Sequence, residues 1–230
     1  MYIVPLIPLA ASLVAALPVG QAEEASLQVR QFGGGLGGGN TRNDVEDGGA
    51  CPRVILVYAR ATGERGNLGI LGGVIGSALE SEFDSVWVQG VGGAYTAGIA
   101  DNMQPDGASP AAITEMVGLF NKAAQACPDA NIVTGGYSQG SALCAAAVRD
   151  VSPDVRSKIA GAVLFGYTKN AQNNGGIPDY PDENVEVFCN AGDMVCTGSL
   201  VVAAPHFAYQ SSARGPAPEF LAARIRAAGS

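Results

Sequence analysis

Gly136-Tyr137-Ser138-Gln139-Gly140 is the stretch that decides the fold, because it joins a predicted strand to a predicted helix. An apolar run over 132–135 predicts the strand, and an alanine-rich run over 138–150 predicts the helix. In that context a G-x-S-x-G pattern is typical of a sharp turn that presents the serine hydroxyl at the carboxyl edge of a sheet. The alternative is a glycine-rich turn whose serine only caps the helix. Ser138 is therefore a candidate nucleophile.

Apolar runs alternate with helical patterns along the rest of the chain. Strands are expected at 54–58, 86–91, 132–135, 160–165 and 185–188, and helices at 67–83, 110–126, 138–150 and 216–228. Strands that are apolar throughout and alternate with helices predict a parallel sheet that is buried on both faces. We therefore expect an α/β fold with a doubly wound, mainly parallel sheet of about five strands and helices on both faces.

The first residues differ from this pattern. The longest apolar run covers 3–17, which is shorter than the roughly 20 residues that span a bilayer. The small-x-small pattern Gly20-Gln21-Ala22 follows it, so residues 1–22 are predicted to be a secretory signal peptide. The alternative, a buried N-terminal helix, is disfavoured by three prolines within the segment. The mature protein is expected to be secreted and extracellular, with no membrane span.

Residues 23–48 are rich in glycine and have almost no apolar periodicity. Such a segment buries too little apolar surface to offset the entropy lost on ordering, so a flexible leader or pro-segment is predicted. The single catalytic domain is then expected to cover 49–230.

The composition excludes several classes of protein. Lys and Arg number 13 against 21 Asp and Glu, so the net charge of −8 leaves no basic surface for nucleic acid. Hydrophobic residues make up 47% and charged residues 15%, the reverse of a disordered chain. The single histidine excludes two-histidine zinc motifs. We expect no metal, no cofactor and a monomer.

A nucleophilic serine needs a base, and His206 is the only histidine available. A lone histidine is commonly a core or surface residue without a function, which is the alternative here. Between 185 and 206 the acidic residues are Glu186, within a predicted strand, and Asp193, in the loop after it. Asp193 is therefore chosen as the partner of His206. The chain order Ser138, Asp193, His206 is that of α/β-hydrolases.

The negative charge that develops on a substrate carbonyl oxygen needs two hydrogen-bond donors. The backbone N–H of Gln139, directly after the candidate nucleophile, is one. Thr62 lies in the loop after the first predicted strand and offers both its N–H and its hydroxyl.

The five cysteines fit an oxidised protein. Several pairings are possible. A local bridge between Cys189 and Cys196, on either side of Asp193, is the simplest one. Cys51 then joins Cys127, and Cys144 is predicted to be a buried free thiol.

The chain resembles fungal cutinases over 51–230. The matching stretches are Tyr58-Ala59-Arg60, Gly66-Asn67-Leu68-Gly69, Gly90-Val91-Gly92-Gly93-Ala94-Tyr95, Gly135-Gly136-Tyr137-Ser138-Gln139-Gly140, Leu164-Phe165-Gly166-Tyr167-Thr168-Lys169-Asn170, Cys189-Asn190-Ala191-Gly192-Asp193-Met194-Val195-Cys196 and Ala204-Pro205-His206. The resemblance implies a secreted serine esterase that cuts cutin, the aliphatic polyester of plant cuticle. It also implies the triad, the oxyanion donors and the two bridges given above, and that Asn102 steadies the oxyanion loop. Cutinases often have Arg-Gly-Ser where this chain has Arg60-Ala61-Thr62.

The substrate class follows from the loops around the predicted site. They are too short for a large lid, so a small lidless α/β-hydrolase is expected. Apolar residues near the triad are expected to form an open rim: Ile99, Val195, Leu200, Val202 and Phe207. The alternative is that these are ordinary core residues. An open apolar rim suits an insoluble aliphatic polyester or lipid ester.

Two other functions remain open. The first is another lidless secreted serine esterase, of the acetylxylan esterase or short-chain lipase type, which acetyl-only activity would favour. The second is a non-catalytic surface-binding or elicitor protein. It would be excluded if the protein hydrolysed esters and Ser138→Ala abolished that hydrolysis.

Overall fold

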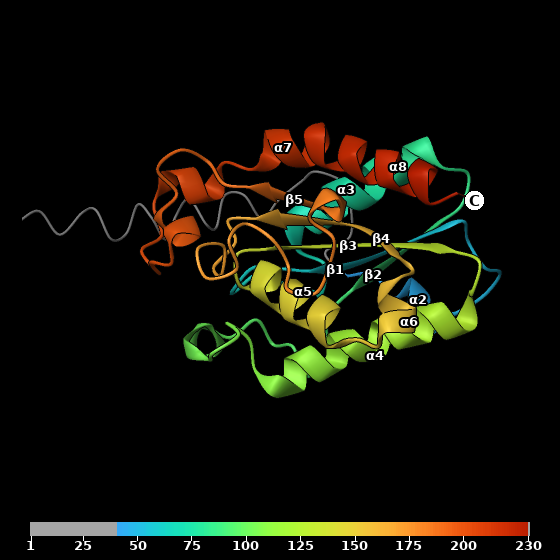
Figure 1. Cartoon of the computed structure of the whole chain (residues 1–230), viewed down its shortest axis with the longest axis horizontal. Coiled ribbons are helices and arrows are strands. Elements are labelled where there is room, and N and C mark those ends of the chain that lie inside the picture. Colours follow the sequence, from blue (N-terminus) through green and yellow to red (C-terminus); the bar gives the residue numbers. More distant parts are fainter. Residues whose placement is uncertain (1–40, 230) are drawn as a thin grey trace, which may run out of the picture. The chain divides into compact units, whose positions relative to one another are not determined.

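The computed structural model describes residues 41–229 (Figure 1). The predicted signal peptide at 1–22 lies outside the described residues, as does the predicted leader as far as residue 40.

One five-stranded sheet organises the described chain. Its strands are β1 (Val54–Ala59), β2 (Val86–Gly90), β3 (Asn131–Tyr137), β4 (Ile159–Phe165) and β5 (Val185–Phe188). Their order is β2-β1-β3-β4-β5, and every neighbouring pair is parallel. The predicted doubly wound α/β sheet is confirmed. After β2 the chain returns to the other side of β1, so the strand order reverses between β1 and β3. Sheets of this kind bind ligands outside the carboxyl ends of the strands at such a reversal point.

Helices cover both faces of the sheet (Figure 1). One layer contains α3 (Gly69–Glu82), α7 (Gln210–Arg214) and α8 (Pro216–Ala228), and the other contains α4 (Pro110–Ala126) and α5 (Gln139–Asp150). Strand β1 serves both layers because successive side chains of a strand point to opposite faces. Val54, Leu56 and Tyr58 belong to the first core. Ile55, Val57 and Ala59 belong to the second. All six are buried, so the run carries no apolar–polar alternation.

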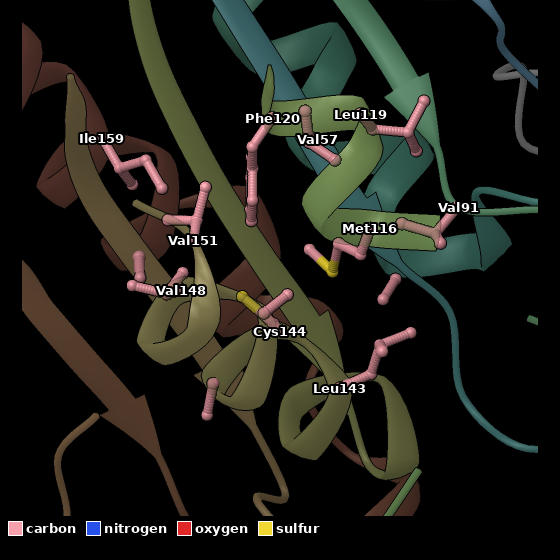
Figure 2. Packing of buried hydrophobic residues seen from close by; sticks show 14 of the residues in the cluster. Val57, Val91, Met116, Leu119, Phe120, Leu143, Cys144, Val148, Val151 and Ile159 are labelled. Atoms are coloured by element: carbon pink, nitrogen blue, oxygen red, sulfur yellow. The ribbon is translucent and has the colours of Figure 1, made fainter. Parts of the chain in front are cut away.

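Figure 2 shows the core between the sheet, α4 and α5. Met116, Leu119 and Phe120 of α4 gather there with Leu143 and Val148 of α5. The alanine-rich α5 is buried on every side, because its small side chains let it lie close to both the sheet and α4. This packing fixes the helix that begins directly after Ser138.

Cys144 of α5 is a fully buried free thiol, as predicted. Its Sγ lies 3.3 Å from Oγ1 of Thr134. Burial raises the pKa of this thiol to about 12, so the reactive thiolate form is suppressed.

Short elements complete the chain. They are α2 (Asp44–Asp47), α6 (Pro153–Arg156) and the 3₁₀ turns η1 (Ile99–Met103), η2 (Asp182–Asn184), η3 (Met194–Thr197) and η4 (Ala204–Phe207). Among the helices of residues 41–229, none combines the length and apolar character needed to cross a membrane.

The segment just before the predicted domain boundary is part of the fold. Arg42 accepts a hydrogen bond of 2.9 Å from the N–H of Gly90, and Asn43 pairs with Gln89 in an antiparallel bridge. Val45 is buried in the core. The prediction of a flexible leader as far as residue 48 is therefore wrong for 42–47. These residues are held mainly by polar contacts with β2, which leave no apolar periodicity in the sequence.

Two disulfides tie the fold together, and both predicted pairings are confirmed. Cys51–Cys127 links the segment before β1 to the end of α4. Cys189–Cys196 closes the loop after β5.

Candidate active site

Ser138 stands at a sharp turn between β3 and α5, with a φ of 57° and a ψ of −118°. A positive φ is unfavourable for a residue with a side chain, so the surroundings must hold the serine there. The glycines of the turn make room for it. A Cβ on Gly136 would lie 2.2 Å from the carbonyl oxygen of Gly140, and one on Gly140 would lie 2.1 Å from that of Ala59. The predicted turn is thus present, and its glycines are required by close backbone approach.

Strand β4 holds this turn in place. The N–H of Ser138 donates to the carbonyl of Phe165 at 2.8 Å. Oγ of Ser141 lies 2.7 Å from the carbonyl oxygen of Gly136 and accepts the N–H of Phe165 at 3.1 Å. These bonds connect the turn to two neighbouring strands, so the strained conformation of Ser138 is imposed by the sheet.

The structure brings together Ser138, His206 and Asp193. Oγ of Ser138 lies 2.9 Å from Nε2 of His206, and Nδ1 of His206 lies 2.8 Å from Oδ2 of Asp193. His206 is 3% exposed and Asp193 4%, whereas Ser138 is only partly buried. The serine hydroxyl therefore faces the surface, with a buried imidazole and carboxylate behind it.

Asp193 is oriented by donors on both of its oxygens. Oδ1 accepts the N–H of Val195 at 3.0 Å, which caps η3. Oδ2 accepts the hydroxyl of Tyr209 at 2.5 Å in addition to its contact with His206. The Cys189–Cys196 disulfide closes the loop that carries this carboxylate. Tyr209 was missed by the sequence analysis.

The backbone around His206 is fixed from two directions. The hydroxyl of Tyr137, the residue before Ser138, donates to the carbonyl of His206 at 2.6 Å. The side-chain amide of Asn190 donates to the carbonyls of Pro205 and Ala208 at 2.9 and 3.1 Å. The imidazole is therefore positioned by the turn after β3 and by the loop after β5 together.

The predicted oxyanion donors lie on adjacent loops, because Ala59 of β1 pairs with Gly136 of β3. The N–H of Gln139 is at the first position of α5, where helices leave N–H groups without an internal partner. Oγ1 of Thr62 accepts the side-chain amide of Asn102 at 3.0 Å, which leaves its own proton available for donation. The side-chain amide of Gln139 donates to the carbonyl of Gly98 at 2.8 Å and so joins α5 to the segment that carries Asn102.

A buried polar cluster supports the loop of Thr62. The N–H of Ala61 donates to Oε2 of Glu64 at 2.7 Å. Arg60 donates to the carbonyl of Val91 at 2.9 Å, and its own carbonyl accepts the hydroxyl of Tyr95 at 2.7 Å. Burial raises the pKa of Glu64, and backbone hydrogen bonds partly offset that effect. The sequence gives no local signal for this cluster, because it joins loops that follow β1 and β2.

Four of the five predicted rim residues are exposed, with exposed fractions from 48% to 79%: Ile99, Leu200, Val202 and Phe207. Val195 is 1% exposed, so its assignment to the rim is wrong. It lies in η3 beside the disulfide, with its side chain turned inward while its N–H binds Asp193. Met103 and Val201 are exposed on the same segments and were missed.

Known proteins share this sequence and fold. A sequence model of the family described as Cutinase matches residues 50–225. "Cutinase 2" of Fusarium vanettenii is 56% identical over 223 residues, covering 95% of this chain and 94% of the relative. The "Cutinase" of Didymella rabiei is 50% identical over 190 residues, covering 81% and 85%.

Solved structures show the same architecture. A Trichoderma reesei cutinase in complex with a phosphonate inhibitor superposes with a TM-score of 0.71 at 26% identity, covering 89% of this chain and 85% of that one. The catalytic core of an acetyl xylan esterase from Trichoderma reesei gives 0.61 at 16% identity, covering 76% and 99%, and shows the fold alone. The family match and the identity over most of the chain lead to one conclusion: the chain belongs to the cutinase family and is a carboxylic ester hydrolase.

Proposed function

We propose that this protein is a secreted cutinase that depolymerises cutin through a Ser138–His206–Asp193 triad and an acyl-enzyme intermediate. The observation that carries the proposal is the continuous hydrogen-bonded chain from Oγ of Ser138 through His206 to Asp193. This hydrogen-bonded series ends at the hydroxyl of Ser138, a residue that is only partly buried.

In the acylation step, Nε2 of His206 takes the proton of Ser138 while Oγ attacks the ester carbonyl carbon. The resulting tetrahedral intermediate carries a negative oxygen, which accepts hydrogen bonds from the N–H of Gln139 and from the N–H and hydroxyl of Thr62. The intermediate collapses as the C–O bond to the alcohol breaks and His206 returns its proton to the leaving alkoxide. Asp193 holds the imidazole with Nδ1 protonated and stabilises the imidazolium.

Deacylation repeats these steps with water as the nucleophile. His206 takes a proton from water, the hydroxide attacks the acyl carbon, and the same donors bind the negative oxygen. The proton then passes from His206 to Oγ of Ser138 as the acid is released. Each cycle consumes one ester bond and one water molecule, and it needs no cofactor.

The rim supports a polyester substrate. Exposed apolar side chains lie on η1, whose Asn102 binds Thr62, and on the segment 200–207, whose His206 contacts Ser138: Ile99, Met103, Leu200, Val201, Val202 and Phe207. An apolar patch next to a reactive group favours aliphatic chains over a carbohydrate backbone. The names of the relatives, cutinases from several fungi, point to the same substrate.

Two disulfides support secretion, because such bonds persist in oxidising compartments. The predicted signal peptide at 1–22 agrees with that location, and direct N-terminal sequencing of the secreted protein tests it.

Three measurements test this function. An organophosphonate should label Ser138, and Ser138→Ala should lower kcat by at least about three decades without changing the circular dichroism spectrum. Purified cutin should yield hydroxy fatty acids. Activity confined to acetyl esters would favour the acetylxylan esterase alternative, and hydrolysis that survives Ser138→Ala would reject the triad.

A further inference from the structure

Oδ2 of Asp193 accepts two hydrogen bonds, one from His206 and one from Tyr209. The distances are 2.8 Å to Nδ1 of His206 and 2.5 Å to the hydroxyl of Tyr209. The oxygen that faces the imidazole is thus shared with a second donor. We propose that Tyr209 is a positioning residue, which fixes the Asp193 carboxylate and limits how strongly that carboxylate favours protonation of His206. This inference rests on the proposed triad.

The direction of the Tyr209 hydrogen bond is determined by its neighbours. The N–H of Asn190 can only donate, and it points to the Tyr209 oxygen at 3.1 Å. The single hydroxyl proton is therefore free for Asp193. Burial, and next the bond to Asp193, raise the pKa of Tyr209, so the hydroxyl remains a donor over the working pH range.

The ring of Tyr209 has no room to turn away. It is 1% exposed and makes edge contacts with the rings of Phe165 and Tyr137, with centroids 5.9 Å apart in each case. It also lies edge-on to the imidazole of His206 at 6.3 Å. Because the aromatic packing fixes the ring, the hydroxyl is held against Asp193 whether or not substrate is present.

Few other titratable or charged groups lie close to Asp193 and His206. The titratable side chains that face the pair are Tyr209, just before α7, and Tyr137, at the end of β3. The charge of Glu64 raises the pKa of Tyr137, after the larger effect of burial. Within residues 41–229, Asp193 forms no ion pair with a lysine or arginine. Tyr209 is therefore the side-chain donor that competes with His206 for the charge of Asp193.

The consequence has a definite sign. A donor on Oδ2 draws negative charge away from the imidazole, which weakens the stabilisation of imidazolium. Without the hydroxyl, Asp193 would favour the protonated form of His206 more strongly. The neutral imidazole that accepts the Ser138 proton would then appear only at higher pH. The carboxylate would also lose one of the donors that fix its plane.

The experiment compares Tyr209→Phe with Tyr180→Phe. Tyr180 is also buried and loses an equivalent bond, from its hydroxyl to the carbonyl of Ile159 at 2.6 Å, outside the site. Because His206 is the only histidine, ¹⁵N-histidine NMR follows its protonation without assignment. We expect Tyr209→Phe to move the titration midpoint of His206, and the acid limb of kcat/KM, up by about half a pH unit or more. We expect kcat to fall about tenfold with KM within about twofold. Tyr180→Phe should match the wild type.

Two outcomes overturn the inference. One is a folded Tyr209→Phe protein whose His206 midpoint and kcat match the wild type, and the other is a loss of kcat without a shift of the midpoint. If Tyr209→Phe does not fold, a monofluorotyrosine placed at 209 alone keeps the ring and strengthens the donor, so the midpoint must move down. A wild-type midpoint that differs from the acid limb of kcat/KM would instead reject the proposed triad.

Discussion

The side-chain amide of Asn102 donates a hydrogen bond of 3.0 Å to Oγ1 of Thr62. The bond occupies a lone pair of the hydroxyl, so the hydroxyl proton of Thr62 remains free to donate to another acceptor. Because Asn102 also binds the carbonyl of Ile99 at 3.2 Å, η1 and the loop of Thr62 are linked through one amide.

Replacing Thr62 tests this arrangement. Thr62→Val keeps the shape and the backbone N–H but removes the hydroxyl, so we expect kcat to fall about a hundredfold, as for loss of one oxyanion donor. Thr62→Ser retains the hydroxyl and should stay within about fivefold, since only the restraint of the β-branched rotamer is lost. Steady-state kinetics on a soluble ester gives both values. A wild-type kcat in Thr62→Val would show that the hydroxyl takes no part.

The exposed rim predicts different behaviour on soluble and insoluble substrates. Ile99→Gln combined with Leu200→Gln should lower the rate on an insoluble polyester about tenfold, because apolar area is lost from the contact surface. The same protein should hydrolyse a short soluble ester at close to the wild-type rate. Equal losses on both substrates would show that these side chains act on the reaction itself.

Interfacial activation should be absent. Ser138 is partly exposed among residues 41–229, so a soluble substrate should reach it directly, and we expect no closed state for an interface to release. Rates on a short ester should rise smoothly through its solubility limit. An abrupt increase at that limit would mean that a segment covers the site in solution.

The two disulfides should affect stability and rate differently. In the chain-entropy model a bridge over a longer loop stabilises more, about 4.5 kcal/mol for the separation of 76 residues in Cys51–Cys127 and about 2.4 kcal/mol for the 7 residues in Cys189–Cys196. Replacing both long-loop cysteines by serine should lower Tm most and spare kcat. Replacing the short pair should lower kcat most, since that loop carries Asp193.

Both double variants should be measured below their unfolding transitions. A larger loss of kcat in the long-loop variant would contradict the support of Asp193 by the short bridge.

The ion pair between Asp106 and Arg149 gives a pH-dependent stability. Hydrogen bonds from Arg149, at 2.8 Å for the shorter one, lower the pKa of Asp106 below its usual value. A carboxyl group whose pKa is lower in the folded state than in the unfolded state stabilises the fold at pH values above its unfolded-state pKa. That stabilisation is lost as the pH falls through the folded-state pKa. Asp106→Asn should therefore lower stability at pH 7 by under about 1 kcal/mol, because the pair is partly exposed. Thermal unfolding should show the difference vanishing near pH 2, and a difference that persists there would exclude ionisation as its cause.

Local sequence signals were sufficient to predict the bounds of a helix or strand where such signals stand at both of its ends. The bounds of α4, β5 and α8 agree with the predicted ranges. Proline opens both helices, and Oγ of Ser109 caps α4 by accepting the N–H of Ala112. Helix α3 begins at Gly69 rather than 67, because the φ of 68° at Gly69 lies outside the right-handed helical region and interrupts the helix there. The side chain of Asn67 binds Arg42 and Asn43.

The residues of the candidate site were predictable because suitable residue types are scarce in this sequence. One histidine and one suitable aspartate forced the choice of His206 and Asp193, and the structure places both at Ser138. The support around them was not predictable. Tyr209 lies 16 residues beyond Asp193, and the orientation of Val195 depends on how the disulfide loop folds, so neither leaves a local pattern.

The pairing of Arg42 and Asn43 with β2 limits how far the N-terminal segment can be shortened without loss of the fold. Strand β2 is at the edge of the sheet, and these residues occupy part of its free hydrogen-bonding side. A protease that cut at residue 48 would expose that edge to pairing with another molecule, the usual route to aggregation of sheet proteins. It would also remove Val45 from the core. If the N-terminal segment is removed, a cut that preserves this fold must therefore lie before Arg42.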